Sequence, residues 1–161
     1  MKAHEIRACF REYYQHRFRE VGLFEFGISW NYDYYGSIFD AFVIVPQRQF
    51  FKGFEFKVSR SDFLSDQKPR KNHYGSLTPK WKHYLKYCHL FYWVTPEGLV
   101  KPEEVEPPAG LVWICPNPRG GFLFRVVKRP KRTTPAMDPK LVQRILFFFA
   151  SRAKTRSDRF F

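Results

Sequence analysis

The amino-acid sequence predicts an α/β fold in which a mixed central sheet is flanked by helices. Three observations support this: an apolar pattern of helical period near the N-terminus, apolar or alternating runs typical of strands, and short turns between them. The expected order is a helix, three strands, a helix, a strand, a two-strand extension and a C-terminal helix. With 161 residues, 44% of them hydrophobic, the chain can bury the core of a single domain.

The N-terminal part of the chain predicts one helix and one strand. Apolar residues recur near the helical period over His4–Arg19, which indicates an amphipathic helix. Leu23–Trp30 alternates, so we expect a half-buried strand with Phe24 and Phe26 on one face. The polar and Gly-containing run that follows predicts a hairpin loop over Asn31–Ser37.

Two apolar runs joined by a short turn form the centre of the predicted sheet. Ile38–Val45 is almost entirely apolar, which favours a strand buried on both faces. Pro46–Gln49 turns the chain, and Phe50–Val58 predicts a third strand with a bulge at Gly53. Because the turn is short, the second and third strands should pair antiparallel.

Shorter elements complete the predicted domain. Ser59–Asp66 is rich in helix-capping residues, and Ser61 or Asp62 should begin a short helix. The remaining expectations are a loop at Pro69–Pro79, a helix at Pro79–Tyr87, strands at Leu90–Thr95, Gly110–Cys115 and Gly121–Val127, and a helix at Pro139–Ala153. The core of this single domain should span about residues 4–128, with a basic C-terminal extension at about 129–161.

Positive charge is concentrated in two segments. Lysine plus arginine outnumber aspartate plus glutamate by 28 to 15, a formal net charge of +13. Residues 57–86 contribute a net charge of +6 and residues 125–161 a net charge of +9, whereas the rest of the chain has −2. Such segregation favours a polyanionic partner, with nucleic acid ahead of an anionic membrane surface and of a generally solvated surface.

Several other classes of protein are disfavoured. Met1–Glu12 lacks the apolar stretch of a secretory signal peptide, and no apolar run approaches the roughly 20 residues of a membrane helix. Cys9, Cys88 and Cys115 lie far apart without metal-binding spacing, so we expect reduced, buried thiols. We therefore expect a cytoplasmic protein that associates with nucleic acid and not with membrane.

One acidic pair and its lysine stand out within the apolar strands. Asp40 is the single acid of the second predicted strand, and Glu55 and Lys57 share one face of the third. If these strands pair, all three groups can converge, and two buried carboxylates require a cation beside them. A divalent cation with oxygen ligands, together with the lysine, would supply the components of phosphodiester hydrolysis. The spacing alone is also compatible with a cross-strand ion pair.

These residues resemble a known superfamily. The run that begins at Asp40, followed by Phe54-Glu-Phe-Lys-Val-Ser-Arg-Ser-Asp-Phe-Leu-Ser-Asp, resembles the PD-(D/E)xK nucleases, and more narrowly the MmcB-like DNA-repair nucleases. The narrower family shares a later run, present here as Lys80-Trp81, Tyr84, Tyr87-Cys88 and Phe91-Tyr92. The resemblance covers roughly Ile6 to Val127. It departs at an insertion, about Pro69–Pro79, and at Phe39, where the motif has proline.

The resemblance implies a restriction-endonuclease-like core and a nuclease that depends on Mg²⁺ or Mn²⁺ and acts on DNA, in DNA repair or a mobile element. It implies that Asp40 and Glu55 bind the metal with the backbone carbonyl of Phe56, while Lys57 positions the attacking water. The residues expected to contact nucleic acid are Arg60, Lys68, Arg70, Lys71, Lys80, Lys82, Tyr84, Lys128, Arg129, Lys131 and Arg132. Nucleases of this class that cut both strands often dimerise, which leaves a homodimer open.

Other interpretations of the same residues remain open at this point. The chain could be a catalytically silent nucleic-acid-binding module with the same fold, or a recruiting protein with a basic docking surface. Asp62 and Asp66 either hold the turn after the third strand and cap a helix, which we favour, or form a second metal site.

Overall fold

The computed structural model describes residues 1–15, 17, 19–27, 38–71, 77–135, 142–143 and 145–147. In chain order its elements are α1 (Ala3–Gln15), β1 (Val21–Gly27), β2 (Ile38–Val45), η1 (Pro46–Arg48), β3 (Phe50–Phe56), α2 (Arg60–Gln67), β4 (Pro69–Lys71), β5 (Leu77–Pro79), α3 (Lys80–Tyr84), β6 (Leu90–Pro96), η2 (Pro102–Glu104), β7 (Gly110–Pro116) and β8 (Phe122–Lys128). The α/β class is confirmed, and the elements follow the expected order over this part of the chain except for the additional β4–β5 hairpin between α2 and α3.

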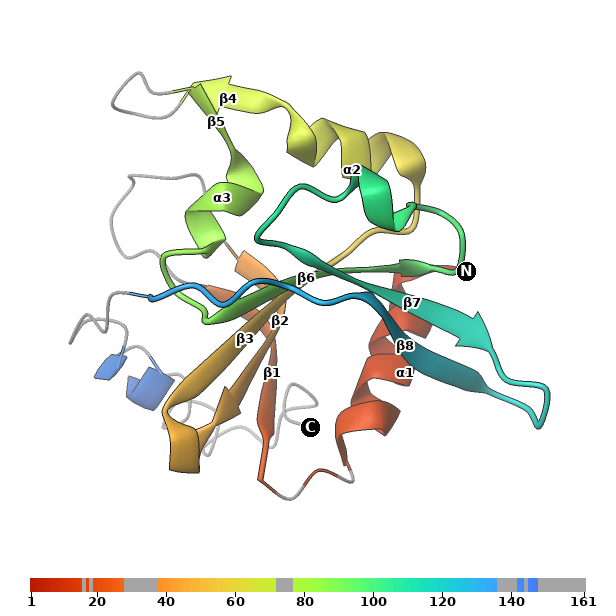
Figure 1. Ribbon diagram of the computed structural model, residues 1–161. Helices are drawn as coiled ribbons and strands as arrows, with labels where there is room; N and C mark the ends of the chain where they lie inside the picture. The colour runs from red at the N-terminus through yellow and green to blue at the C-terminus, as the bar shows by residue number, and fades with distance from the viewer. Residues whose placement is uncertain are drawn as a thin grey trace.

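Six strands form one mixed sheet in the order β1-β2-β3-β6-β7-β8. The β1–β2, β2–β3 and β7–β8 pairs are antiparallel, whereas β3–β6 and β6–β7 are parallel. The segment that connects β3 to β6 contains α2, the β4–β5 hairpin and α3, and it lies on one side of the sheet, while α1 lies on the other (Figure 1). The chain therefore enters this crossover at the C-terminal end of β3.

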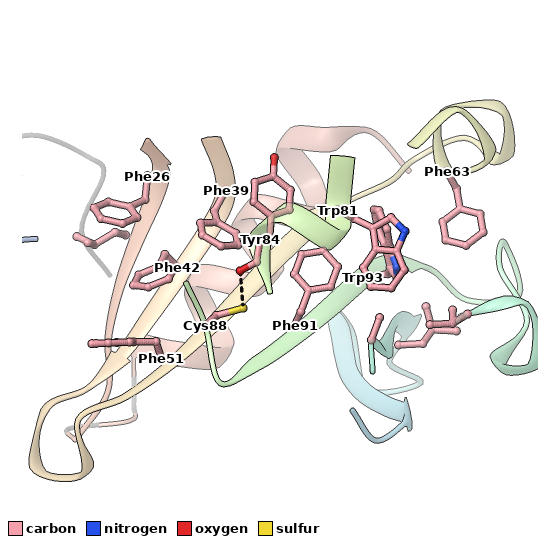
Figure 2. Close-up of a cluster of buried hydrophobic side chains, with 14 of the residues drawn as sticks. Phe26, Phe39, Phe42, Phe51, Phe63, Trp81, Tyr84, Cys88, Phe91 and Trp93 are labelled. Atoms are coloured by element: carbon pink, nitrogen blue, oxygen red, sulfur yellow. Dashed lines mark hydrogen bonds between the residues drawn. The ribbon is translucent and has the colours of Figure 1, made fainter. Parts of the chain in front are cut away.

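Each face of the sheet has its own apolar cluster. We call the side covered by α2 and α3 the α3 face, and the side covered by α1 the α1 face. On the α3 face, aromatic rings follow one another across the strands (Figure 2), including Phe26, Phe39, Phe42, Phe51, Phe63, Trp81, Tyr84, Phe91 and Trp93. On the α1 face, Ile6, Cys9, Phe10 and Tyr14 pack on the sheet residues Phe24, Ala41, Val43, Phe54, Val94, Val112 and Ile114.

The alternation of side chains breaks where β1 and β2 lie side by side. Phe24 belongs to the α1 face and Phe26 to the α3 face, so the expectation that they share a face is wrong. Glu25 between them has a φ of 52°, a left-handed conformation that turns the following side chain to the other face. Across the pair, Phe39 and Ala41 also lie on opposite faces. Asp40, between them, therefore lies at a break in the strand pattern.

Several predicted boundaries are wrong by a few residues. α1 ends at Gln15, because the Arg17 N–H donates to the Tyr14 carbonyl at 2.9 Å and closes the last turn. Ser59, not Ser61 or Asp62, is the N-cap of α2. The predicted Pro69–Pro79 loop contains the short β4–β5 hairpin, and α3 has five residues where a longer helix was expected.

Gly53 has a packing role and not the predicted bulge. The pairing of β2 with β3 runs from Val45↔Phe50 to Ala41↔Phe54 without a register shift. A Cβ at Gly53 would lie 2.4 Å from Cε1 of Phe39, so the absence of a side chain there makes room for the Phe39 ring.

The C-terminal prediction can be followed only in part. Most of the predicted Pro139–Ala153 helix lies outside the described residues; those described within it have helical backbone, and Ile145 packs against the α3-face cluster. The three cysteines are free thiols and all are buried. Within the described ranges, no helix has the length and apolar character needed to cross a membrane.

Candidate functional site

Asp40 and Glu55 lie next to each other where β2 and β3 separate. The last paired residues of the two strands are Ala41 and Phe54. Beyond this pair, the Phe56 N–H donates to Asp40 Oδ2 at 2.7 Å. The carboxylate of Asp40 thus occupies the gap between the strands and binds a backbone group of β3.

Glu55 is a buried carboxyl group with an unsatisfied oxygen. It is 3% exposed, and its Oε1 has no hydrogen-bond partner. Burial raises its pKa to about 8, and the neighbouring Asp40 adds to the rise, whereas Lys57 and Lys80 oppose it. An unpaired buried oxygen on an acid costs free energy, so this side chain is suited to binding a proton or a cation.

Asp40 responds to the same environment less strongly. Burial raises its pKa, while the Phe56 N–H and the positive charges of Lys57 and Lys80 lower it. The hydrogen bond from Phe56 stabilises the ionised form and fixes one oxygen in place. Asp40 is therefore the more readily ionised of the two carboxyl groups.

Lys57 lies beside Glu55, but its closest partner is on α2. Its Nζ is 2.6 Å from Asp66 Oδ2, 3.6 Å from Asp62 Oδ2 and 3.7 Å from Glu55 Oε2. The side chain is 8% exposed. Burial would lower its pKa, but Glu55, Asp66 and Asp62 together raise it. Lys57 is thus held as an ammonium ion among three acidic side chains.

Asp66 does not cap a helix, but it does hold the segment after β3 in place. It is buried and contacts Lys57 and Arg70, and so ties α2 to the end of β3 and to β4. The capping part is performed by Ser59, whose hydroxyl accepts from the Asp62 N–H at 3.2 Å. A signal was present: with Ser59 as N-cap, Phe63 and Asp66 are three residues apart on one helix face, and a buried Phe63 brings Asp66 inward.

Asp40, Glu55 and Phe56 provide part of the set of oxygen ligands that a small divalent cation needs. Asp40 and Glu55 would supply carboxylates, and Phe56 would supply its backbone carbonyl. The N–H and C=O of one strand residue point to the same side of the strand, and the Phe56 N–H faces Asp40 of β2, so the Phe56 carbonyl faces β2 as well. In the part of the chain that the structure describes, no group of three or more His, Cys, Asp or Glu residues could hold a metal. Mg²⁺ is commonly bound through one or two carboxylates, with water and substrate phosphate completing its shell.

The basic residues predicted to contact nucleic acid differ in their availability. Arg60 binds Glu104, Lys82 binds Glu106 at 2.6 Å, and Arg70 contacts Asp66 at 3.3 Å. Lys80 begins α3, 5.6 Å from the Tyr84 ring centroid, and its charge lowers the pKa of both site carboxyls. The residues exposed along the hairpin and after β8 are Lys68, Lys71, Arg129, Lys131 and Arg132, the last over the Phe50 ring.

Two of these predictions need correction. Tyr84 is 1% exposed, its ring packs on Phe39, and its hydroxyl donates to the Ile38 carbonyl at 3.1 Å, so the prediction that it contacts nucleic acid is wrong. The ammonium group of Lys128 donates to the carbonyls of Pro102 and Val105 and is not presented to a phosphate. Both residues hold neighbouring segments together.

A comparison with solved structures finds the same fold in a protein of unknown function. The match is to the SPO1766 protein of unknown function from Silicibacter pomeroyi, with a TM-score of 0.69 and 18% sequence identity. It covers 98% of this chain and 92% of that one. No protein-family model matches the chain, and no curated protein matches it. At this identity the likeness shows the fold alone: a mixed six-stranded sheet flanked by helices.

Proposed function

We propose that this protein is a metal-dependent nuclease that hydrolyses phosphodiester bonds of DNA, with Asp40, Glu55 and Lys57 at its reaction centre. One observation supports this above the others. Two carboxyl groups from neighbouring strands lie together at the end of the β2–β3 pair, and the more buried of them, Glu55, keeps an unpartnered oxygen. An arrangement that is costly in the isolated protein becomes favourable when a cation binds.

Asp40 and Glu55, with the Phe56 carbonyl, are the groups that would bind Mg²⁺ or Mn²⁺. Such a cation, when bound, lowers the pKa of water and neutralises charge on a phosphate. Asp40 is prepared for this role because the Phe56 N–H already fixes one of its oxygens. Glu55 must first lose the proton that its raised pKa favours, so binding of the cation releases a proton from Glu55.

Lys57 contributes a positive charge that stays in place. Among Glu55, Asp62 and Asp66 it remains an ammonium ion, so it stabilises negative charge that develops on the phosphate and orients the attacking water, and does not act as a base. Lys80 adds a second positive charge that the site carboxyls already sense.

The remaining charge favours a polyanionic substrate. The chain has a formal net charge of +13, and Lys68 and Lys71 are exposed close in sequence to α2 and Asp66. Phosphate contacts by such residues provide affinity without sequence preference.

The second candidate is a nucleic-acid-binding module that has the fold without the chemistry. The observation that favours it is the small donor set: within the described residues, no group of three or more His, Cys, Asp or Glu side chains could hold a metal ion. A module of this kind would bind DNA through its basic residues and cleave nothing.

The deciding experiment incubates the purified protein with supercoiled, linear and single-stranded DNA, and with RNA, in Mg²⁺, Mn²⁺ or EDTA. The proposal predicts cleavage of DNA that EDTA abolishes and that Asp40→Asn and Glu55→Gln reduce by at least about a hundredfold. Gel-shift titration of the same variants should show near-native affinity, because the basic residues that bind phosphate are unchanged. Good binding without cleavage under any condition would instead favour the silent module.

A further inference from the structure

We infer that Asp66, which lies on α2, is a positioning residue for Lys57: it holds the lysine ammonium at a fixed place beside Glu55. The inference rests on the proposed nuclease function and adds to it a residue outside the Asp40, Glu55 and Lys57 set.

The contacts of Lys57 single out Asp66 from the other two carboxylates. Asp66 Oδ2 lies 2.6 Å from Nζ, a hydrogen-bonding distance, whereas Asp62 and Glu55 are 3.6 and 3.7 Å away. The side chain of Asp66 is 11% exposed and that of Asp62 is 52% exposed. A short, buried, charge-assisted hydrogen bond fixes geometry, whereas an exposed charge beyond hydrogen-bonding distance does not.

The Asp66 carboxylate is itself oriented from its other side. Its Oδ1 accepts from Arg70 at 3.3 Å, and Arg70 also contacts the Ser65 hydroxyl at 3.3 Å. The two oxygens of Asp66 are thus divided between two cations, which determines the rotation of the carboxylate plane. Arg70 belongs to β4, so the hairpin supports Asp66 from outside while Lys57 binds it from inside.

The packing of α2 places Asp66 over the site. Ser59, two residues after Lys57, is the N-cap of α2, so the helix begins close to the end of β3. Phe63, one turn before Asp66, is 1% exposed and meets Trp93 edge to face at 5.3 Å. Lys57 Nζ lies 5.8 Å from the centroid of the same Trp93 ring. The Trp93 indole therefore contacts both Phe63 of α2 and the Lys57 ammonium group, and so fixes the rotation of α2 and the course of the Lys57 side chain.

Without Asp66, the ammonium group would have Glu55 as its remaining buried partner. The lysine would then move toward a carboxylate that the proposed function assigns to the cation. Asp66 keeps Lys57 near Glu55 without a direct hydrogen bond between them, which leaves Glu55 available to the cation that the proposed function assigns to it.

The test compares Asp66→Asn with Asp62→Asn, a matched change of the same residue type one turn away on the same helix. In single-turnover cleavage of DNA at saturation, Asp66→Asn should lower the rate about tenfold or more with unchanged DNA affinity. Asp62→Asn should stay within about twofold of wild type, because its charge is screened by solvent. Asp66→Glu, which keeps the carboxylate, should recover part of the rate.

Two further measurements separate positioning from a structural role. In a Lys57→Met background, Asp66→Asn should cause no further loss of rate if it acts through Lys57. Independently of cleavage, the ¹⁵N signal of the Lys57 ammonium should be visible through slow proton exchange in wild type and Asp62→Asn, and broadened in Asp66→Asn. If Asp66→Asn fails to fold by itself, two other comparisons decide the question: Asp66→Glu with wild type, and Lys57→Met with the Lys57→Met, Asp66→Asn double variant.

The outcomes are distinguishable from failure of the proposed function. Equal rates for Asp66→Asn and Asp62→Asn, with active wild type, overturn the inference and leave the nuclease intact. A full additional loss in the Lys57→Met background overturns it as well, because Asp66 then acts by another route. Wild-type protein that cleaves no substrate in Mg²⁺ or Mn²⁺ removes the function and, with it, the positioning role.

Discussion

The two faces of the sheet differ in what they bury. On the α1 face a helix of 13 residues covers an apolar cluster in which Phe10 packs against Phe24, Phe54 and Phe124. On the α3 face two helices of eight and five residues cover a larger aromatic cluster that ends at Glu55, Lys57 and Asp66. The first face buries mainly apolar side chains, besides the part-buried ion pair of Lys52 with Glu20, whereas the second buries several charged groups together with its apolar side chains.

The α1 face therefore contributes mainly stability, and the α3 face carries the residues proposed for chemistry. Apolar burial does not depend on pH, so Phe10 and the apolar cluster around it should stabilise the fold independently of pH. The buried charges of the α3 face compensate one another only incompletely, as the unpartnered oxygen of Glu55 shows. Changes on the two faces should therefore affect different measurements.

The largest expected effect on stability is on the α1 face. Phe10 is 0% exposed, and Phe10→Ala should lower the free energy of unfolding by about 3–5 kcal/mol. Phe122, 41% exposed on β8, is the matched control, and Phe122→Ala should cost less than about 1 kcal/mol. Urea denaturation of both variants measures the difference. Similar losses for the two would mean that α1 contributes little to the core.

A change on the α3 face should separate activity from stability. Glu55→Gln should lower DNA cleavage by at least about a hundredfold, or about 2.7 kcal/mol of transition-state stabilisation. At pH 8 and above the same variant should be more stable than wild type, because it removes a carboxylate whose burial raises its pKa to about 8. Single-turnover kinetics and thermal denaturation test both parts. A variant that is less stable at this pH would contradict the second.

The pH dependence of unfolding should come from the α3 face. The pKa of Glu55 rises from 4.5 to about 8 on folding, so the folded state keeps a proton that the unfolded state has lost. Stability is therefore highest below about pH 4.5 for this group, and it falls between there and about pH 8, by at most about 1.4 kcal/mol per pH unit. Glu55→Gln should flatten the curve over this window, while Phe10→Ala should shift it without changing its slope.

The smallest expected effects concern the exposed lysines next to the α3 face. Lys68→Ala and Lys71→Ala should each weaken DNA binding a few-fold and reduce the salt dependence by a slope of about 0.7–0.9 per lost phosphate contact. Lys82→Ala is the control, because Lys82 is paired with Glu106 at 2.6 Å and should matter less. Fluorescence anisotropy across a salt series measures both. A larger effect for Lys82 would mean that its ion pair opens when DNA binds.

Local patterns predicted most of the fold. The apolar runs of β2, β3 and β6 and the amphipathic pattern of α1 were recognised, because alternation and helical period are local properties. The antiparallel pairing of β2 with β3, and with it the neighbourhood of Asp40 and Glu55, followed from the short turn between them. The β4–β5 hairpin was missed because its strands have three residues each and contain prolines.

What the sequence could not provide are contacts between distant segments. The face switch at Glu25 depends on a left-handed residue that no alternation pattern reveals. The burial of Tyr84 depends on Phe39 of β2, and the ion pair of Lys57 with Asp66 depends on how Phe63 packs on Trp93. Each of these contacts joins residues from separate elements, and tertiary packing decides them.

The contact between Gly53 and Phe39 has a consequence for engineering. The Phe39 ring fits against β3 only because Gly53 has no side chain, and a Cβ there would lie 2.4 Å from the ring. Phe39 precedes Asp40 and also packs on Tyr84 at 4.5 Å, so the ring has little freedom to move aside. In a mutagenesis library, Gly53→Ala would therefore displace Asp40 although it changes no charge. A library that keeps every ionisable residue unchanged but allows Gly53→Ala would therefore still contain variants with a disrupted site.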